Sequence, residues 1–226
     1  MPSRRRSTAR SLRRHKPMPR AEFFARLGLF VRRDFLDEAT CARLCDEMLA
    51  ADARPATVWE AGEGFVVDRG TRRTSHRSVS ESSSSFVEHR LLGLRSDLAR
   101  HFKVRLTGCR KPGFLAYNLG DFYRPHRDNS GGPGAAHMVR ERRVSAVVFL
   151  NSGTAAGRAG HYLGGALTFY GLFEDPRLTD RGLPLEADAG LMVAFPSNLV
   201  HGVAPVSDGV RCTIVTWFIE AEATPA

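Results

Sequence analysis

The part of the chain after residue 113 is a succession of short apolar or alternating runs separated by glycine, proline, asparagine and aspartate. Runs this short, with turn residues between them, predict β-strands rather than helices, and several in series predict an all-β sandwich or barrel. The runs lie at residues 114–119, 144–150, 166–170, 190–195, 200–205 and 212–219. This pattern constrains the fold more than any other feature of the chain.

The region before residue 109 shows helical periodicity instead. Residues 38–50 place apolar side chains three and four positions apart, after an aspartate (Asp37) suited to cap a helix, and residues 86–102 carry a second apolar stripe. Residues 57–67 predict a strand or hairpin arm, and the serine run at 82–85 predicts a loop or the lead-in to a helix. We therefore expect three segments: a tail at 1–20, a helical support region at 21–108 and a β-domain at 109–222.

The first twenty residues account for most of the net charge of +9. They carry eight arginines or lysines and no acid, whereas the remaining residues carry 25 basic and 24 acidic groups. A segment this polar and charged is expected to be disordered. It could be an arm that contacts nucleic acid or an acidic partner, a transit peptide, or an extension before a true start at Met18. No aromatic residue interleaves with its arginines, so we do not expect specific nucleic-acid binding.

The remaining composition is that of an ordinary globular chain of 226 residues, which suits one domain. No apolar run reaches the roughly 18 residues that a membrane helix needs, so no membrane partner is expected. The four cysteines are scattered without a CxxC pair, which predicts reduced, buried thiols and a cytoplasmic protein. Arginine far outnumbers lysine, as a GC-rich bacterial genome would produce.

Two histidines and one aspartate are candidates for a metal site. His126 and Asp128 have the spacing that directs two side chains to one side of a strand, and His201 lies at the turn between two later strands. Two imidazoles and a carboxylate can take one face of an octahedral Fe(II) ion and leave other positions open. His137 and His161 lie in glycine-rich loops, and we take them as loop residues rather than ligands.

Arg211 lies ten residues after His201 and is the first residue of an alternating strand. On one face of that strand it is accompanied by Thr213, Val215 and Trp217. A buried arginine is costly unless it is paired, and beside an open metal site a carboxylate ligand is its natural partner. We expect Thr213 and Trp217 to be neighbours of this ligand, and an apolar rim supplied by Phe149, Val215 and Trp217.

Four motifs follow one another between residues 114 and 211. They are FLAYNLGDFYRPHRD at 114–128, RVSAVVFLN at 143–151, GGALTFY at 164–170, and FPSxxxH followed by PV and GxR at 195–211. In order and spacing they resemble the catalytic domain of prolyl 4-hydroxylase-like Fe(II)/2-oxoglutarate dioxygenases. The resemblance covers about residues 109–220.

This resemblance implies a mainly β fold, a double-stranded β-helix or jelly-roll core with flanking helices. It implies His126, Asp128 and His201 as iron ligands and Arg211 as the anchor of the C5 carboxylate of 2-oxoglutarate. Tyr117 matches a tyrosine that often helps to hold that carboxylate. The implied cofactor and cosubstrates are Fe(II), 2-oxoglutarate and O₂, with L-ascorbate as a candidate accessory. One departure is Phe149, which stands where some members of the prolyl hydroxylase branch have a second tyrosine.

The function expected from this resemblance is hydroxylation of a C–H bond in an amino-acid, peptidyl (prolyl-like) or protein substrate, with release of succinate and CO₂. Asp128 argues against halogenation, because a halogenating site needs that ligand position for a halide. Two alternatives remain: a non-catalytic jelly-roll scaffold that works through its arginine-rich tail, and an oxygenase acting on a small metabolite.

The walls of the substrate site are harder to predict. The pattern-poor stretches at 129–143, 153–164 and 171–188 are expected to be lids or walls. Trp59 with Arg72 and Arg73 could also wall a groove, but core packing and a solvated run of charge are the preferred interpretations.

Overall fold

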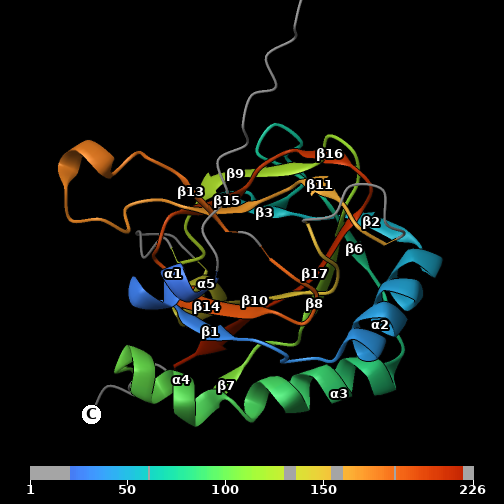
Figure 1. Cartoon of the computed structure of the whole chain (residues 1–226), viewed down its shortest axis with the longest axis horizontal. Helices are drawn as coiled ribbons and strands as arrows, with labels where there is room; N and C mark the ends of the chain where they lie inside the picture. The colour runs from blue at the N-terminus through green and yellow to red at the C-terminus, as the bar shows by residue number, and fades with distance from the viewer. Residues whose placement is uncertain (1–20, 61, 130–135, 154–159, 186, 221–226) are drawn as a thin grey trace, which may run out of the picture.

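Two facing β-sheets form the body of the protein, and helices cover the outer face of the larger one (Figure 1). The computed structural model describes residues 21–60, 62–129, 136–153, 160–185 and 187–220. Within these residues the larger sheet has eight strands. In spatial order they are β1 (Phe30–Arg32), β14 (Met192–Pro196), β10 (Arg142–Phe149), β17 (Arg211–Ile219), β8 (Gly113–Tyr117), β6 (Ser75–Arg77) and β2 (Ala53–Pro55), with β7 (Gly108–Cys109) paired to β17.

The smaller sheet has five strands, in the order β13 (Leu183–Leu185), β12 (Leu167–Phe169), β15 (His201–Val203), β9 (Phe122–His126) and β5 (Arg72–Arg73). From β8 onward the chain passes back and forth between the sheets. Strands β8, β10, β14 and β17 join the larger sheet, while β9, β12 and β15 join the smaller one, all in antiparallel pairs. Strands that alternate between two sheets in this way form a jelly roll, so the predicted fold is confirmed.

Two further pairs of strands lie outside these sheets. One pairs β11 (Leu163–Gly164) with β16 (Val206–Asp208), and the other is the hairpin of β3 (Val58–Glu60) and β4 (Gly64–Val66). The hairpin falls inside the predicted segment 57–67. Short helices are found at α1 (Ala21–Arg26), α5 (His137–Arg140) and the 3₁₀ turn η1 (Pro176–Leu178).

Three longer helices lie along the outer face of the larger sheet: α2 (Glu38–Ala50), α3 (Glu81–Leu92) and α4 (Arg95–Phe102) (Figure 1). Helix α2 starts where predicted, because the Asp37 carboxylate accepts a 2.7 Å hydrogen bond from the backbone N–H of Thr40. The single helix expected at 86–102 is wrong. The helix breaks at Gly93, a residue that lowers helix stability. The serine run belongs to α3 itself, because Ser80 caps that helix.

The region 21–108 is not only a helical support. It supplies β1, β2 and β6 to the larger sheet and β5 to the smaller one. These strands have two or three residues each, too few for an alternating pattern to be visible in the sequence. Both sheets therefore include strands from either side of the boundary expected at residue 108.

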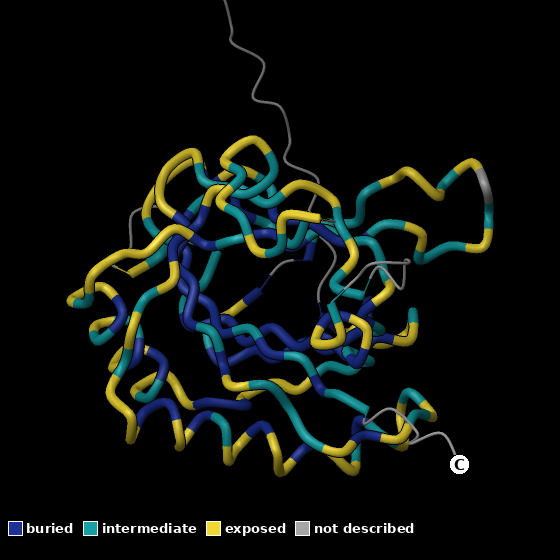
Figure 2. The backbone as a smooth tube through the Cα atoms, turned by 180° about the vertical axis from the view of Figure 1, so that it is seen from behind, coloured by how far each residue is buried: buried dark blue, intermediate teal, exposed yellow. Residues whose placement is uncertain are grey.

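Strand β17 separates two hydrophobic cores, as its alternating sequence predicted. Cys212, Ile214 and Phe218 belong to the outer core, which packs against buried residues of α2, α3 and α4 such as Leu44 and Leu91. The opposite face of the larger sheet packs against β12, β13 and β15 of the smaller sheet. Figure 2 shows the result: the strands in the middle are buried, and the outward sides of the helices and the loops are exposed.

Other predictions concern features around this body. All four cysteines are free; Cys41 and Cys212 are buried as expected, whereas Cys45 and Cys109 are partly exposed. No helix among the described residues combines the length and apolar character needed to cross a membrane. The tail 1–20 and parts of the loops 129–143 and 153–164 lie outside the described residues.

Candidate active site

His126, Asp128 and His201 come together at the edge of the two-sheet core. Strands β9 and β15 are antiparallel neighbours, and their register sets His126 directly opposite His201. Asp128 follows β9 at once, and its Oδ1 lies 3.5 Å from His126 Nε2 while its Oδ2 lies 3.4 Å from His201 Nε2. The ligand atoms of the three side chains all lie within 4.8 Å of one another, so they can share one metal ion.

The backbone sets which nitrogen each histidine offers. Nδ1 of His126 lies 2.9 Å from the carbonyl oxygen of Arg124, and Nδ1 of His201 lies 2.9 Å from that of Leu199. A carbonyl only accepts, so each Nδ1 carries a proton and each Nε2 turns its lone pair toward Asp128. Metal–ligand bonds of about 2.0–2.2 Å put adjacent ligand atoms about 3 Å apart, close to the spacing found. Two imidazoles and one carboxylate in this arrangement fit Fe(II).

Burial and mutual electrostatics shift the pKa values of this triad. Burial lowers the pKa of His126, which favours the neutral form that binds metal. Burial alone would raise the pKa of Asp128, but the two histidines outweigh it and hold that pKa well below its usual value. At His201 burial is again opposed, and the Asp128 carboxylate raises its pKa. A metal ion must therefore compete chiefly with a proton on His201.

Ser145 orients the carboxylate of the triad from the neighbouring strand β10. Its Oγ lies 2.6 Å from Asp128 Oδ2 and 2.9 Å from Ser197 Oγ, and both serines are buried. The backbone N–H of Asn129 donates to the carbonyl of Ser197, which fixes the chain just after Asp128. These contacts hold Asp128 in place before any metal binds.

We predict that Ser145→Ala weakens Mn(II) binding by roughly 10- to 100-fold, the usual effect of removing a partner that orients a metal ligand. Mn(II) titration followed by electron paramagnetic resonance measures this directly. Ser197→Ala is the matched control, because it keeps the bond between Ser145 and Asp128 and should have a smaller effect. Equal affinities for Ser145→Ala and the unmodified protein would contradict this role.

Arg211 lies at the buried start of β17 and is 1% exposed. Its guanidinium carbon lies 5.0 Å from the Tyr117 ring and 5.1 Å from the Phe149 ring, and Nη1 donates to Thr213 Oγ1 at 3.3 Å. Within the described part of the chain no carboxylate pairs with it, and its Nε and Nη2 have no hydrogen-bond partner. A buried cation without a counter-charge is costly, so the surroundings of Arg211 fit a ligand that brings a carboxylate.

The glycine pair before β12 makes room for this arginine. Gly165 has a φ of +59°, and a Cβ there would lie 3.0 Å from Arg211 Cδ and 2.9 Å from Val206 Cγ2. A side chain at this position would therefore push on the arginine stem. Tyr162 is buried next to Arg211, and burial raises its pKa against the opposing effect of the Arg211 guanidinium.

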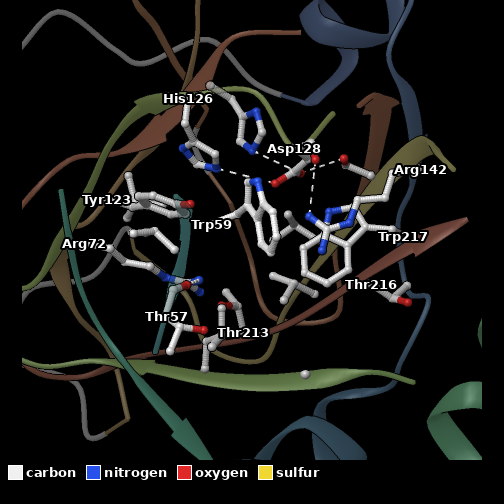
Figure 3. A pocket seen from close by; sticks show the side chains of 18 of the residues that line it. Thr57, Trp59, Arg72, Tyr123, His126, Asp128, Arg142, Thr213, Thr216 and Trp217 are labelled. Atoms are coloured by element: carbon white, nitrogen blue, oxygen red, sulfur yellow. Dashed lines mark hydrogen bonds and ion pairs between the residues drawn. The ribbon is translucent and has the colours of Figure 1, made fainter. Parts of the chain in front are cut away.

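A cavity of about 510 Å³ joins the triad to Arg211. Tyr117 and Thr213 line it beside Arg211, and Leu167 and Val203 line it between the two ends. Figure 3 shows the opposite walls, where Trp59 and Arg72 face His126 and Asp128 across the cavity and Arg142 lies over Trp217. The cavity therefore has a buried end at Arg211 that suits a small anion and another end at the metal triad.

Three expectations about the walls need correction. Trp59 and Arg72 line the cavity, rather than the core or a solvated charge run, because the β3–β4 hairpin and β5 fold over it. Phe149 is not a rim residue: it is buried and packs against Arg211 from outside the cavity. Trp217 lies six residues along β17 from Arg211, about 20 Å for an extended strand, so it is placed near Asp128 instead.

The loop predictions have mixed outcomes. Val139 and Arg142, at the end of the segment 129–143, line the cavity. The described residues of 153–164 and 171–188 do not line it, and the latter segment projects from the body (Figure 1). His137 and His161 also lie outside the cavity, in agreement with their lower ranking as ligands.

Sequence reasoning missed several residues that contact the triad. Tyr123 stacks on His126 with ring centroids 3.5 Å apart, and Arg142 Nη1 donates to the backbone carbonyl of Asp128 at 3.2 Å. Tyr123 lies in the motif before His126 but three residues away, where strict alternation would not place it on the same side. Ser145 could have been found, because it shares a face of β10 with Val147, which points into the cavity.

The fold and the site together define a jelly-roll protein with a His-Asp-His metal site and a buried arginine for a carboxylate. Residues 112–219 match the sequence model of the 2OG-Fe(II) oxygenase superfamily. Over these residues the chain is similar to that superfamily. The match to this superfamily implies Fe(II) and 2-oxoglutarate, and the His126, Asp128 and His201 cluster could hold the metal.

Two curated relatives are similar over the same domain. A PKHD-type hydroxylase of Thermosynechococcus vestitus is 36% identical over 104 residues, and one of Rippkaea orientalis is 33% identical over 104 residues. Each alignment covers 46% of this chain and 40% of the relative. The likeness thus spans less than half of these relatives.

Solved structures resemble the chain over most of its length. A Pseudomonas putida prolyl-4-hydroxylase superposes with a TM-score of 0.65 at 23% identity, covering 88% of this chain and 96% of that one. A prolyl hydroxylase of Trichoplax adhaerens, solved with a peptide of hypoxia inducible factor, gives 0.61 at 17% identity over 88% and 86%. At these identities the likeness establishes the fold alone.

Proposed function

We propose that the protein is an Fe(II)- and 2-oxoglutarate-dependent dioxygenase that hydroxylates a C–H bond of an amino-acid or peptidyl substrate, prolyl or similar, and releases succinate and CO₂. The observation that carries this proposal is the shared cavity. At one end lies a metal triad, and at the other a buried arginine that has no acidic partner in the described part of the chain; together they suit one small carboxylate ligand that reaches both.

The roles of the side chains follow from their positions. His126, Asp128 and His201 would hold Fe(II), while Arg211, helped by Thr213 and Tyr117, would hold the C5 carboxylate of 2-oxoglutarate. When bound, these groups supply the oxidation of a C–H bond by O₂, coupled to decarboxylation of 2-oxoglutarate. The buried side chains between the two ends exclude water, which strengthens the pairing of Arg211 with a carboxylate.

Hydroxylation rather than halogenation is supported by Asp128. Its carboxylate is present and lies close to both histidines and to Ser145, so this ligand position is filled by the protein. This ligand position is therefore not free for a halide. A chlorinated product from an otherwise competent enzyme would contradict this part of the proposal.

We propose an amino-acid or peptidyl substrate because of the proteins to which the chain is similar. Its curated relatives are named hydroxylases, and its structural neighbours include prolyl hydroxylases, one solved with a peptide. We also propose work in the cytoplasm, because four free cysteines suit a reducing compartment. The scaffold alternative is less well supported, since it has no use for a buried arginine beside a metal triad.

Succinate formation tests the proposed activity. Purified protein with Fe(II), 2-oxoglutarate and L-ascorbate, our proposed accessory reductant, should release succinate, and more in the presence of an accepted substrate. Mass spectrometry of a cell extract treated in this way should reveal a product heavier by one oxygen atom. No succinate under any condition, from protein that still binds Mn(II), would favour the scaffold alternative.

A further inference from the structure

Arg142 lies at the metal end of the cavity, and only some of its N–H donors make hydrogen bonds. It is half-buried, its guanidinium carbon is 3.8 Å from the centre of the Trp217 ring, and its Nη1 is used by the carbonyl of Asp128. Its Nε is buried and has no hydrogen-bond partner, and no carboxylate side chain pairs with the guanidinium among the described residues. The guanidinium lines the cavity and keeps N–H donors that the Asp128 carbonyl does not use, so it can bind an anion.

A bulge in β10 turns this side chain into the cavity. The register of β10 against β17 shifts between Arg142 and Val144. Without the shift, strand alternation would direct Arg143 to the side of Ser145. With it, Arg142 faces the cavity and Arg143 pairs with Glu220 at 2.8 Å. Bulges beside active sites commonly re-aim a side chain in this manner.

Arg72 presents a second guanidinium on another wall. Its guanidinium carbon lies 4.6 Å from the centre of the Tyr123 ring, and its Nη1 donates to the carbonyl of Thr57 at 2.9 Å. Its Nε is buried and has no hydrogen-bond partner within the described residues. In Figure 3 the guanidinium groups of Arg72 and Arg142 both extend toward the middle of the cavity. Both side chains are stacked on rings, so their guanidinium groups are held in place before a ligand arrives.

The charges that line the cavity are mostly positive. Asp128 and Arg211 have roles toward the metal and the cosubstrate, and Lys111 is paired with Glu81. Among the other described lining residues, Arg72, Arg127 and Arg142 are cations and Glu60 is the single acid. A neutral ligand would leave the guanidinium groups of Arg72 and Arg142 without a counter-charge as it displaced their water.

We infer that the substrate carries a carboxylate, bound by Arg142 and attracted by Arg72, close to the C–H bond that is hydroxylated. That the bound molecule is a substrate rests on the proposed function, but the binding of a carboxylate can be tested without turnover. It narrows the substrate class to molecules with a free carboxylate, such as free or N-acylated amino acids and the carboxyl ends of peptides. An uncharged internal residue of a polypeptide would leave both guanidinium groups unpaired.

Both tryptophans of the chain, Trp59 and Trp217, line this cavity, so intrinsic fluorescence can report binding. The probes are the twenty N-acetyl amino acids and the corresponding N-acetyl amino-acid amides, which differ in the charge at the chain end. They are titrated into protein with Mn(II) and saturating 2-oxoglutarate, and into protein without either. We expect at least one acid to bind about tenfold or more tightly than its amide, as a charge-assisted contact implies.

The variants assign this preference to a residue. Arg142→Gln should reduce the acid-to-amide ratio to near one, and Arg72→Gln should reduce it in part without touching Asp128. Arg143→Gln is the matched control, since it removes the same charge from the adjacent residue and should preserve the ratio. The inference is overturned if no acid binds, if acids and amides bind alike, or if the preference survives Arg142→Gln. Failure of 2-oxoglutarate to bind would instead contradict the proposed function, and the series without it would still test Arg142.

Discussion

Replacing Arg211 by glutamine is expected to lower the affinity for 2-oxoglutarate by about 30-fold or more while Mn(II) binding is preserved. Removing one partner of a buried, hydrogen-bonded charge pair costs about 2–5 kcal/mol, which corresponds to this range or beyond. Arg211 meets these conditions, because it is 1% exposed and its Nε and Nη2 lack partners within the described chain. Calorimetric titration of 2-oxoglutarate into Mn(II)-loaded protein measures the change without turnover.

Thermal stability provides an independent measure of the same substitution. Without ligand, Arg211→Gln should be as stable as the unmodified protein or more so, because it removes a buried charge that has no acidic partner among the residues the structure describes. With 2-oxoglutarate, the unmodified protein should gain stability in proportion to the logarithm of ligand concentration, and the variant should gain much less. Arg32→Gln, at an exposed position of β1, is the control for a lost charge. Unchanged 2-oxoglutarate affinity in Arg211→Gln would rule out Arg211 as the anchor.

The central part of the site could be predicted from the sequence because its residues are marked by type and by strand spacing. His126 and His201 face each other since β9 and β15 are neighbours, a consequence of the jelly-roll order that the motifs indicated. Arg211 and Thr213 share a face because alternation along β17 is regular. Where a strand is long and regular, its pattern in the sequence was sufficient.

The walls of the site could not be predicted because they depend on irregularities. A bulge directs Arg142, rather than Arg143, into the cavity, and nothing in a run of two arginines marks the register shift. Trp59 reaches the cavity through a hairpin that belongs to neither main sheet. Trp217 lies on the same face of β17 as Arg211, but it is too far along the strand from Arg211 to contact the cosubstrate there. Alternation predicts the face of a strand and not this distance. These contacts are set by tertiary packing.

The N-terminal region shows the same limit for the fold. Helix α2 was predicted well because its cap and its apolar stripe are local signals. The strands β1, β5 and β6 were missed, since each has two or three residues and becomes a strand only by pairing with β14, β9 and β8. Their formation is a property of the assembled sheets, which a local pattern cannot report.

Substitution of His126 by alanine is expected to have the largest effect of all on metal binding and to abolish succinate formation. Loss of a partner that only orients a ligand already costs roughly 10- to 100-fold in metal affinity, and loss of one of three direct ligands must exceed that. His126 offers its Nε2 to the metal position while its Nδ1 is held by the carbonyl of Arg124. Tyr123, which stacks on this histidine, presents a ring face to it rather than a ligand atom.

His137→Ala is the matched control for this substitution, because His137 is largely exposed, lies in α5 outside the cavity and was the rival candidate in the sequence. It should bind Mn(II) and release succinate like the unmodified protein. Titration of Mn(II) into both variants, followed by the succinate assay with Fe(II), separates loss of metal from loss of turnover. Succinate release that persists in His126→Ala at unmodified rates would mean that the metal is held elsewhere. The jelly-roll triad would then be a structural cluster, and the proposed dioxygenase activity would have to be assigned to other residues.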